Sequence, residues 1–171
     1  EIGTSFSYTV NADDASAVTY SINDTANFNI NPSTGEITNV TILSVGGYGL
    51  NITATDASMN SVSQIVTVTV QDTGAPVINS VVLNTTNPNA GEDILVTVNA
   101  TDAGGVISVG ANGVSLTDQG SNMWSGIITA IAGTHSVNVS ATDGAANIIW
   151  DNSTSYSTSG LTGTISGKVT K

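Results

Sequence analysis

The sequence has no cysteine and almost no positive charge. Its 171 residues include two basic side chains, Lys168 and Lys171, against 13 acidic ones, and the net charge is −11. Binding of phosphate groups needs clustered Lys and Arg, so we expect nucleic acid and anionic membranes to be poor partners. Without cysteine the chain does not belong to the disulfide-rich secreted proteins, although a prokaryotic cell surface remains compatible with the sequence.

Long apolar runs and helix signals are also missing. No run of about 18 apolar residues is present, so we expect no insertion into a membrane. The sequence shows no signal-peptide pattern and begins at Glu1 directly in a strand-like pattern, which predicts a mature or excised fragment. Charged residues make up 9% of the chain, so its solubility must come from Ser, Thr, Asn and Gly.

Apolar and polar residues alternate along most of the chain. Tyr48, Leu50, Ile52 and Ala54 are each separated by one glycine or polar residue, and residues 66–71 alternate valine with Thr and Gln. A period of two is typical of a strand with one buried face, and turn residues interrupt the pattern roughly every 8–12 residues. The sequence therefore predicts an all-β fold of the sandwich type.

The strand pattern restarts after Gln71, at the turn-rich segment 72–76 (DTGAP). One sandwich takes roughly 100 residues, so this chain suits two small ones in tandem. We predict a first module over residues 1–72, a second over residues 73–160 and a terminal strand over residues 161–171. In that terminal segment Leu161, Ile165 and Val169 share one face. It would either begin a further module or be donated to a neighbouring subunit.

The second module carries a hairpin signal, because Asn112-Gly113 between two apolar runs favours a type I′ turn. An internal repeat links the two modules: residues 51–56 (NITATD) recur as residues 138–143 (NVSATD). In both, an Asn follows four residues after the Asp. The residues expected to fill the second core are Trp124, Ile128, Val139 and Trp150.

These motifs resemble known extracellular modules. Residues 28–37 (FNINPSTGEI) and the hairpin over residues 51–72 are similar to cadherin-like and related immunoglobulin-like modules, and the segment from Pro76 to about Tyr156 resembles bacterial or archaeal immunoglobulin-like modules. The resemblance implies two tandem immunoglobulin-like or cadherin-like β-sandwiches, as in large prokaryotic surface proteins. The multi-carboxylate linker of calcium-dependent cadherins has a single counterpart at this junction, Asp72.

Four aspartates at strand ends are candidate ligands for calcium, which takes six to eight oxygen ligands. They are Asp56, Asp72, Asp102 and Asp143. In the alternative interpretation, each carboxylate accepts backbone N–H groups within its own turn, since an Asp followed by Asn four residues later can close a hairpin. No cofactor is expected otherwise.

Asn-x-Ser/Thr sequences mark acceptor sites for N-glycosylation. They occur at Asn23, Asn39, Asn51, Asn84, Asn99, Asn138 and Asn152. Asn51, Asn99 and Asn138 each lie between two apolar residues, so alternation along a strand predicts that their side chains point away from the core. Plain polar surface is the alternative interpretation.

Catalytic signals are weak. The sequence has one histidine, His135, and no Gly-x-Ser-x-Gly elbow, and the paired acids Asp13–Asp14 and Glu92–Asp93 are expected at turns. We therefore expect a non-enzymatic structural or adhesive protein outside the cell, with neighbouring modules, identical subunits or glycans as partners. One alternative is a self-assembling filament or surface-layer subunit that uses a donated terminal strand. The other is an accessory carbohydrate-binding module of a secreted enzyme.

Overall fold

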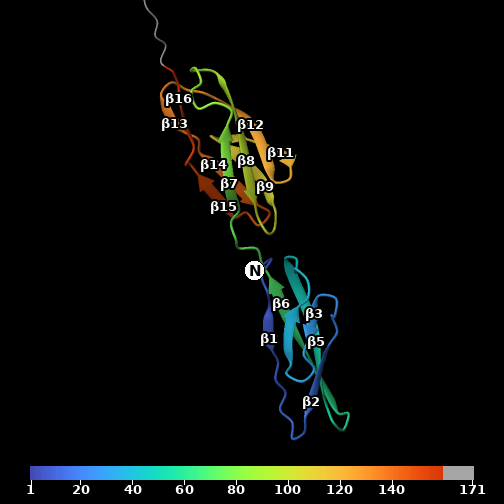
Figure 1. Ribbon diagram of the computed structural model, residues 1–171. Coiled ribbons are helices and arrows are strands. Elements are labelled where there is room, and N and C mark those ends of the chain that lie inside the picture. Colours follow the sequence, from blue (N-terminus) through green and yellow to red (C-terminus); the bar gives the residue numbers. More distant parts are fainter. Residues whose placement is uncertain (160–171) are drawn as a thin grey trace, which may run out of the picture. The chain divides into compact units, whose positions relative to one another are not determined.

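The computed structural model describes residues 1–159, which form strands, turns and loops without any helix. The predicted all-β class is confirmed. The chain divides into a first unit, Glu1–Gly74, and a second unit that begins at Ala75, two residues beyond the predicted start of the second module (Figure 1). The predicted terminal strand over residues 161–171 lies outside the described residues.

The first unit is a sandwich of two antiparallel sheets with three strands each. One sheet has the order β1 (Ser7–Thr9), β4 (Glu36–Asn39), β3 (Phe28–Ile30), and the other has the order β2 (Val18–Ile22), β5 (Gly46–Asp56), β6 (Ser61–Val70). Alternate residues of these strands meet in one core, which contains Tyr20, Phe28, Ile30, Ile37, Leu43, Leu50, Ile52, Ala54, Val68 and Val70.

The second unit has two four-stranded sheets. The first has the order β11 (Thr117–Gly120), β12 (Met123–Thr129), β8 (Asp93–Thr101), β7 (Val77–Leu83). The second has the order β10 (Val114–Ser115), β9 (Val106–Ala111), β14 (Val139–Asp143), β15 (Ile148–Asp151). A short pair, β13 (Thr134–Ser136) with β16 (Ser155–Ser157), extends the β14–β15 hairpin. The core contains Ile94, Val96, Val98, Val109, Trp124, Ile128, Val137, Val139 and Tyr156 among others.

Both units have the strand order of an immunoglobulin-type sandwich. In the second unit β7, β8, β12 and β11 correspond to strands A, B, E and D, and β9, β14 and β15 correspond to C, F and G. The first unit has B, E and D as β1, β4 and β3, and C, F and G as β2, β5 and β6. It therefore has the same six-strand framework, but β1 lacks a neighbour equivalent to β7 within residues 1–159.

The D–E turn of the first unit depends on glycine. Gly35 has φ +71°, and a Cβ atom there would collide with the Val10 carbonyl oxygen and approach the Tyr20 ring to 3.3 Å. The turn is closed by Asn31, whose side-chain oxygen accepts the N–H groups of Ser33 and Thr34. The segment predicted by the FNINPSTGEI motif is thus a tight turn packed against the chain at Val10.

The first residues of the chain lie beside the end of the first unit. The Ile2 N–H donates to the Gln71 carbonyl at 2.8 Å, and the Glu1 carboxylate accepts the Thr73 hydroxyl at 2.6 Å and the Thr73 N–H at 3.2 Å. These bonds, led by the Thr73 hydroxyl, lower the pKa of Glu1 below its ordinary value. Residues 1 and 74 of this unit therefore lie at the same pole.

Two predictions about the second unit have different outcomes. Asn112 and Gly113 have φ 48° and 80° and join the antiparallel strands β9 and β10, as the type I′ prediction requires. Trp124, Ile128 and Val139 are buried, but Trp150 is 58% exposed, so its assignment to the core is wrong. Trp150 pairs with Ser140 on the outer face of the sheet, while its neighbour Ile149 packs against the core.

Candidate functional site

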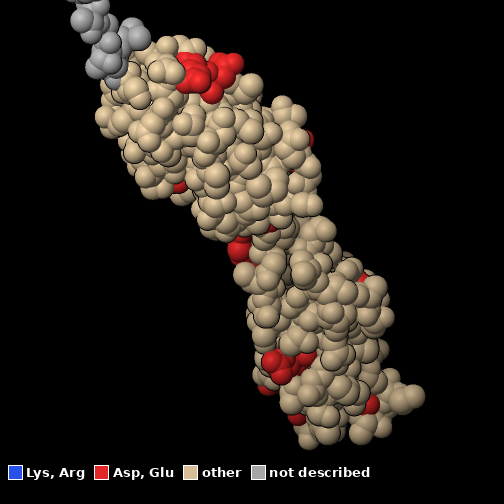
Figure 2. All heavy atoms as spheres, turned by 45° about the horizontal axis from the view of Figure 1, so that its top comes forward, with Lys and Arg blue, Asp and Glu red and all other residues tan. Residues whose placement is uncertain are grey.

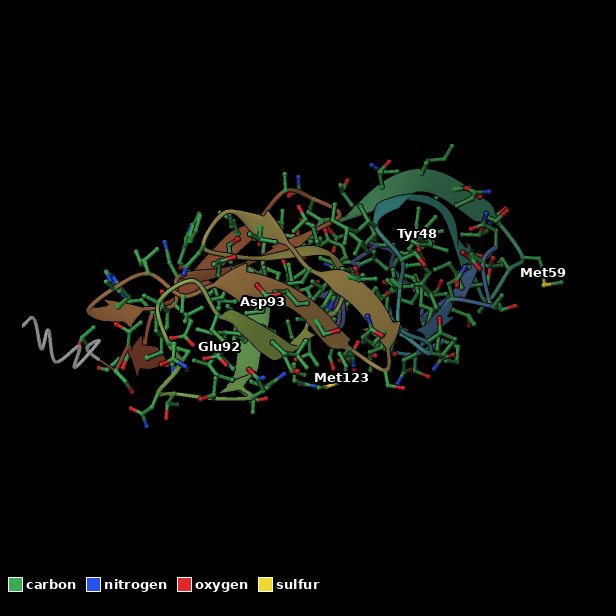
Figure 3. All side chains as sticks on the ribbon, turned by 90° about the horizontal axis from the view of Figure 1, so that it is seen from above. Tyr48, Met59, Glu92, Asp93 and Met123 are labelled. Carbon is green, nitrogen blue, oxygen red and sulfur yellow. The ribbon has the colours of Figure 1, made fainter. Side chains whose placement is uncertain are left out.

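The F–G turn of the first unit is closed by one carboxylate. The Asp56 side chain accepts the backbone N–H groups of Ser58 and Asn60 and the side-chain amide of Asn60, each at 2.8 Å. Met59 has φ 71° and lies at the tip of the turn, with its side chain pointing outward (Figure 3). This geometry matches the turn interpretation of Asp56, because its carboxylate oxygens already accept several N–H groups.

The F–G turn of the second unit repeats this network. The Asp143 carboxylate accepts the N–H groups of Ala145 and Asn147 and the Asn147 side-chain amide, at 2.9, 2.8 and 2.8 Å. Ala146 has φ 66°, the counterpart of Met59. The units differ in burial, since Asp143 has an exposed fraction of 0% whereas Asp56 is half-buried. The repeated NITATD and NVSATD segments thus encode the same strand and the same turn.

These hydrogen bonds shift the acidity of both aspartates. The Asn60 side-chain amide, followed by the Asn60 backbone N–H, lowers the pKa of Asp56 below its ordinary value of 3.8. Burial acts to raise the pKa of Asp143, but the N–H groups of Asn147, Ala145 and Ala146 together outweigh burial and leave the pKa lowered. Both carboxylates are therefore charged at neutral pH.

The four predicted calcium ligands do not form one site. Asp56 precedes β6 and Asp72 follows it, so the ten residues of this strand separate them within the first unit. In the second unit a carboxylate oxygen of Asp102 lies within 4.8 Å of one of Asp143, and Asp102 also accepts the Gly104 N–H at 2.7 Å. Asp102 and Asp143 are thus the two predicted ligands that this unit brings together.

The predicted glycosylation sites differ in exposure. The side chains of Asn23, Asn51, Asn84, Asn138 and Asn152 are exposed, and those of Asn39 and Asn99 are half-buried. The Asn39 amide donates to the Thr41 carbonyl, and the Asn99 amide contacts the Met123 sulfur. Since Leu50, Ile52, Val137 and Val139 are buried, the asparagines between them point away from the core.

Catalytic candidates have structural roles in the described residues. The His135 ring contacts the Ala132 carbonyl at 2.9 Å, and its centroid lies 5.7 Å from that of Tyr156. Glu92, at the start of β8 (Figure 3), accepts the Asn89 N–H at 2.7 Å and so closes its own turn. Asp14 does the same for Ser16. We find no nucleophile–base pair among these groups within residues 1–159.

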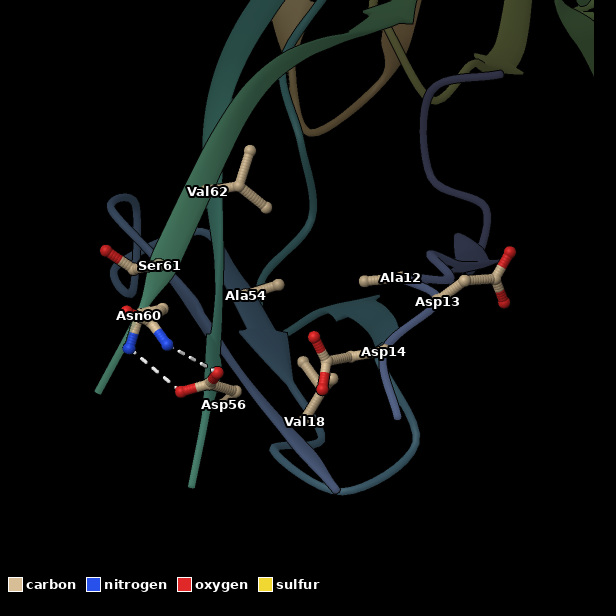
Figure 4. A pocket seen from close by; sticks show the side chains of 9 residues that line it. All are labelled: Ala12, Asp13, Asp14, Val18, Ala54, Asp56, Asn60, Ser61 and Val62. Atoms are coloured by element: carbon tan, nitrogen blue, oxygen red, sulfur yellow. Dashed lines mark hydrogen bonds between the residues drawn. The ribbon is translucent and has the colours of Figure 1, made fainter. Parts of the chain in front are cut away.

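A continuous groove lies between residues 10–14 and strand β6 of the first unit. It consists of two hollows of about 200 and 120 Å³ that share Ala12, Ala54 and Val62. Figure 4 shows Ala12 and Ala54 facing each other across the larger hollow, with Asp14 and Asp56 beside it, while the Asp13 carboxylate points away. The groove is therefore lined by both apolar and polar side chains and is acidic at one end.

In the second unit, a separate hollow of about 220 Å³ lies on the outer face of the β9–β14–β15 sheet. Ser140 pairs with both Gly110 and Trp150, so these three residues form a row across the sheet. Asn138 and Ser108 also line the hollow. A Cβ atom at Gly110 would approach the Ser140 hydroxyl to 3.3 Å, so glycine keeps the floor low beside the exposed indole.

No protein-family model matches the sequence, and no curated protein matches it. Among solved structures, the fibronectin(III)-like modules of Clostridium thermocellum CbhA have 16% identity and a TM-score of 0.40, over 98% of this chain and 93% of theirs. Mouse cadherin-23 EC22-24 has 22% identity and a TM-score of 0.35, over 83% and 51%. The eight N-terminal Ig domains of Down syndrome cell adhesion molecule have 11% identity and a TM-score of 0.44, over 92% and 22%.

Sequence reasoning missed the groove and the Trp150 hollow. Val62 lies on the same face of β6 as the core residues Val68 and Val70, yet 67% of its side chain is exposed. Trp150 follows Ile148 and Ile149, and three apolar residues in a row conceal which face is buried.

Proposed function

We propose that this chain is a structural and adhesive part of an extracellular protein on a bacterial or archaeal cell surface. The observation that carries the proposal is that one six-strand framework occurs twice in succession, each time with its own core and the same carboxylate-closed F–G turn. Such modules act by geometry, because each holds its surface residues at fixed positions without ligand-dependent chemistry. The proposed role is non-catalytic.

The surface chemistry supports an exposed location. Within residues 1–159 acidic side chains form small patches on an otherwise uncharged surface, and Lys and Arg are absent (Figure 2). Ser, Thr and Asn cover much of the rest, including the exposed glycosylation candidates at Asn51, Asn138 and Asn152. No described helix is long and apolar enough to span a membrane.

Labelling of intact cells tests this proposal. Antibodies raised against the purified chain should bind unpermeabilised cells of the source organism, and a mass shift removed by deglycosylation should map to exposed asparagines. The matched control is Asn51→Gln, which removes one candidate without touching the core. Labelling that requires permeabilisation would contradict an extracellular role.

We also propose that neither unit needs a metal to fold, because amide N–H groups already bind the carboxylate oxygens of Asp56 and Asp143. Any bound calcium would then use Asp102 and Asp143, and it would stabilise the second unit by mass action. Melting curves in chelator and in millimolar calcium test this, with Asp102→Asn as the variant. A first unit that unfolds in chelator would contradict the proposal.

A second candidate function is carbohydrate binding, and the exposed Trp150 favours it. An indole face beside Ser and Asn side chains can stack on a sugar ring while the polar groups bind its hydroxyls. A glycan array tests this candidate directly. Trp150→Ala should abolish binding and leave the melting temperature unchanged, whereas binding that survives the substitution would exclude the hollow as the site.

A further inference from the structure

The first unit leaves a long strand edge open. β6 pairs with β5 from Ser61 to Val70, and on its other side the bond from Ile2 to Gln71 lies just beyond its end. Within residues 1–159, β1 likewise pairs with β4 on one side. The second unit covers the corresponding region, because β7 pairs with β8 and the chain at Thr86 and Pro88 accepts the N–H groups of Ser157 and Ser159.

Apolar side chains are exposed along this open edge. Val62 and Val66 lie on the same face of β6 as the core residues Val68 and Val70, yet Val62 is 67% exposed and Val66 is half-buried. Tyr8 pairs with the fully buried Ile37 and so faces inward, but it is 51% exposed. An unpaired edge above an apolar groove is a template for a further strand.

The groove ends in uncompensated negative charge. Asp14 and Asp56 line its larger hollow (Figure 4). Hydrogen bonds from Ser16 lower the pKa of Asp14 and those from Asn60 lower the pKa of Asp56, so both carboxylates carry a charge. No Lys or Arg occurs among residues 1–159 to balance them. A strand that fits this groove should therefore be apolar on one face and basic near one end.

Residues 161–171 (LTGTISGKVTK) have these properties. Leu161, Ile165 and Val169 recur every four residues on one face, as do Val62, Val66 and Val70 on β6. In an antiparallel pairing that places Val169 opposite Val62, Ile165 faces Val66 and Leu161 faces Val70. Lys171 then lies opposite Asn60, beside Asp56 and Asp14. The segment also contains both basic residues of the chain, Lys168 and Lys171.

We propose that residues 161–171 of a second copy of this chain bind the groove of the first unit as an added strand antiparallel to β6. The donor is assigned to a second copy because β16, the last described strand, ends at the opposite end of the second unit from the residue at which the chain enters it. β16 ends beside Thr86 and Pro88, whereas the chain enters at the start of β7 (Figure 1). The 11 residues of the segment 161–171 are too few to run back along the seven residues of β7 and also pair with the ten residues of β6.

This inference goes beyond the proposed function, since a monomeric surface module needs no such contact. Light scattering on the full chain should show association that grows with concentration, above the monomer mass of 17.2 kDa. Ile165→Asp in the donated strand or Val62→Asp in the groove should return the mass to that of the monomer. The matched controls, Thr164→Asp and Ile65→Asp, lie on the opposite faces of the same strands and should still associate.

Cysteine cross-linking tests the register, because the natural chain has no cysteine. A chain with Val66→Cys and Ile165→Cys should form a ladder of disulfide-linked species on a non-reducing gel. Asn29→Cys, on β3 of the other sheet, replaces Val66→Cys in the control chain and should give monomers. A monomer with an internal disulfide would overturn the assignment to a second copy.

A competition experiment tests the occupant. A synthetic peptide of residues 161–171 should dissociate the full-chain assembly, and the peptide with Lys171→Gln should require roughly tenfold more for the same effect. Concentrated salt should weaken association through the same charges. A full chain that stays monomeric at every concentration and gives no intermolecular disulfide would overturn the proposal. That result is expected if residues 161–171 belong to a further module.

Discussion

In the second unit β8 lies between β7 and β12, whereas β1, the corresponding strand of the first unit, pairs with β4 and has an open edge within residues 1–159. The shared strands have kept the same F–G turn and the same inward alternation, so they are sufficient to define a sandwich. The flanking strand has a different effect: it decides whether inward-facing residues such as Val62 are covered or exposed to water. The comparison indicates that the six shared strands can form a sandwich whether or not a flanking strand covers its edge.

The largest expected effects come from the separate cores. Phe28→Ala should destabilise the first unit by about 3–5 kcal/mol and leave the second unit folded, because each core is filled by its own residues. Val96→Ala should do the reverse, by about 2–3 kcal/mol. Calorimetry of the full chain should show one transition moving in each variant. Loss of both transitions together would mean that the units fold as one.

The D–E turns should respond differently to the same substitution. Gly35 and Gly120 have φ +71° and +79°, but the space around Gly120 is open. Gly120→Ala should cost about 1–2 kcal/mol from backbone strain. Gly35→Ala adds the collision with Val10 and should cost on the order of 3 kcal/mol or more. Denaturant unfolding measures both, and equal costs would show that the Val10 contact relaxes freely.

The two F–G turns differ in burial, and alanine at each aspartate tests what burial adds. Asp143→Ala removes a fully buried carboxylate that accepts the amide groups of Ala145 and Asn147, whereas water can more readily replace the half-buried carboxylate of Asp56. We expect Asp143→Ala to lower the melting midpoint of the second unit by roughly 10 °C, and Asp56→Ala to lower that of the first unit by roughly half as much. A larger loss for Asp56→Ala would contradict this account.

Acid should weaken both turns in the same direction. Because folding lowers the pKa of Asp56 and Asp143 below 3.8, their contribution is complete above about pH 4 and is lost as the pH falls further. Melting midpoints should therefore be flat between about pH 7 and 5 and decline below pH 4. Asn60→Ala removes the main cause of the Asp56 shift, so the first unit should then lose less stability on acidification than the natural chain.

The smallest expected effect is that of removing residues 161–171. Residues within 1–159 already fill a core in each unit, so the chain truncated at residue 160 should keep both melting midpoints within about 1 °C when measured as a dilute monomer. At high concentration the untruncated chain should melt higher in its first unit alone. A large loss of stability in the dilute truncated chain would show that the tail belongs to the second sandwich.

The sequence predicted what depends on local pattern. Period-two alternation was enough for the all-β class, and Asn112-Gly113 was enough for a type I′ hairpin, because each is determined by neighbouring residues. The NITATD and NVSATD repeat correctly predicted two equivalent turns. The closure of these turns by Asn60 and Asn147 was one of two interpretations, and hydrogen-bond geometry was needed to distinguish it from a metal site.

The features that depend on neighbours in space were not predictable in this way. Whether Val62 is buried depends on a strand beside β6, and the sequence of β6 does not indicate whether such a strand is present. Trp150 was assigned to the core because a run of consecutive apolar residues does not show which of them face inward. The pairing of Trp150 with Ser140 places its side chain on the outer face of the sheet. The separation of Asp56 from Asp72 follows from the length of β6, which single residues do not reveal.

The position of residue 1 next to Thr73 has a mechanical consequence. Tension applied between residues 1 and 75 would load the Ile2–Gln71 bond and the Glu1–Thr73 bonds at one pole, so they would break one after another without unfolding the sandwich. In the second unit, tension between residues 75 and 159 would pull along β7 and β16 in opposite directions. The bonds of Ser157 and Ser159 to Thr86 and Pro88 would then share the load in shear. Under tension at these residues the second unit would therefore resist in shear, whereas little force would pass through the first.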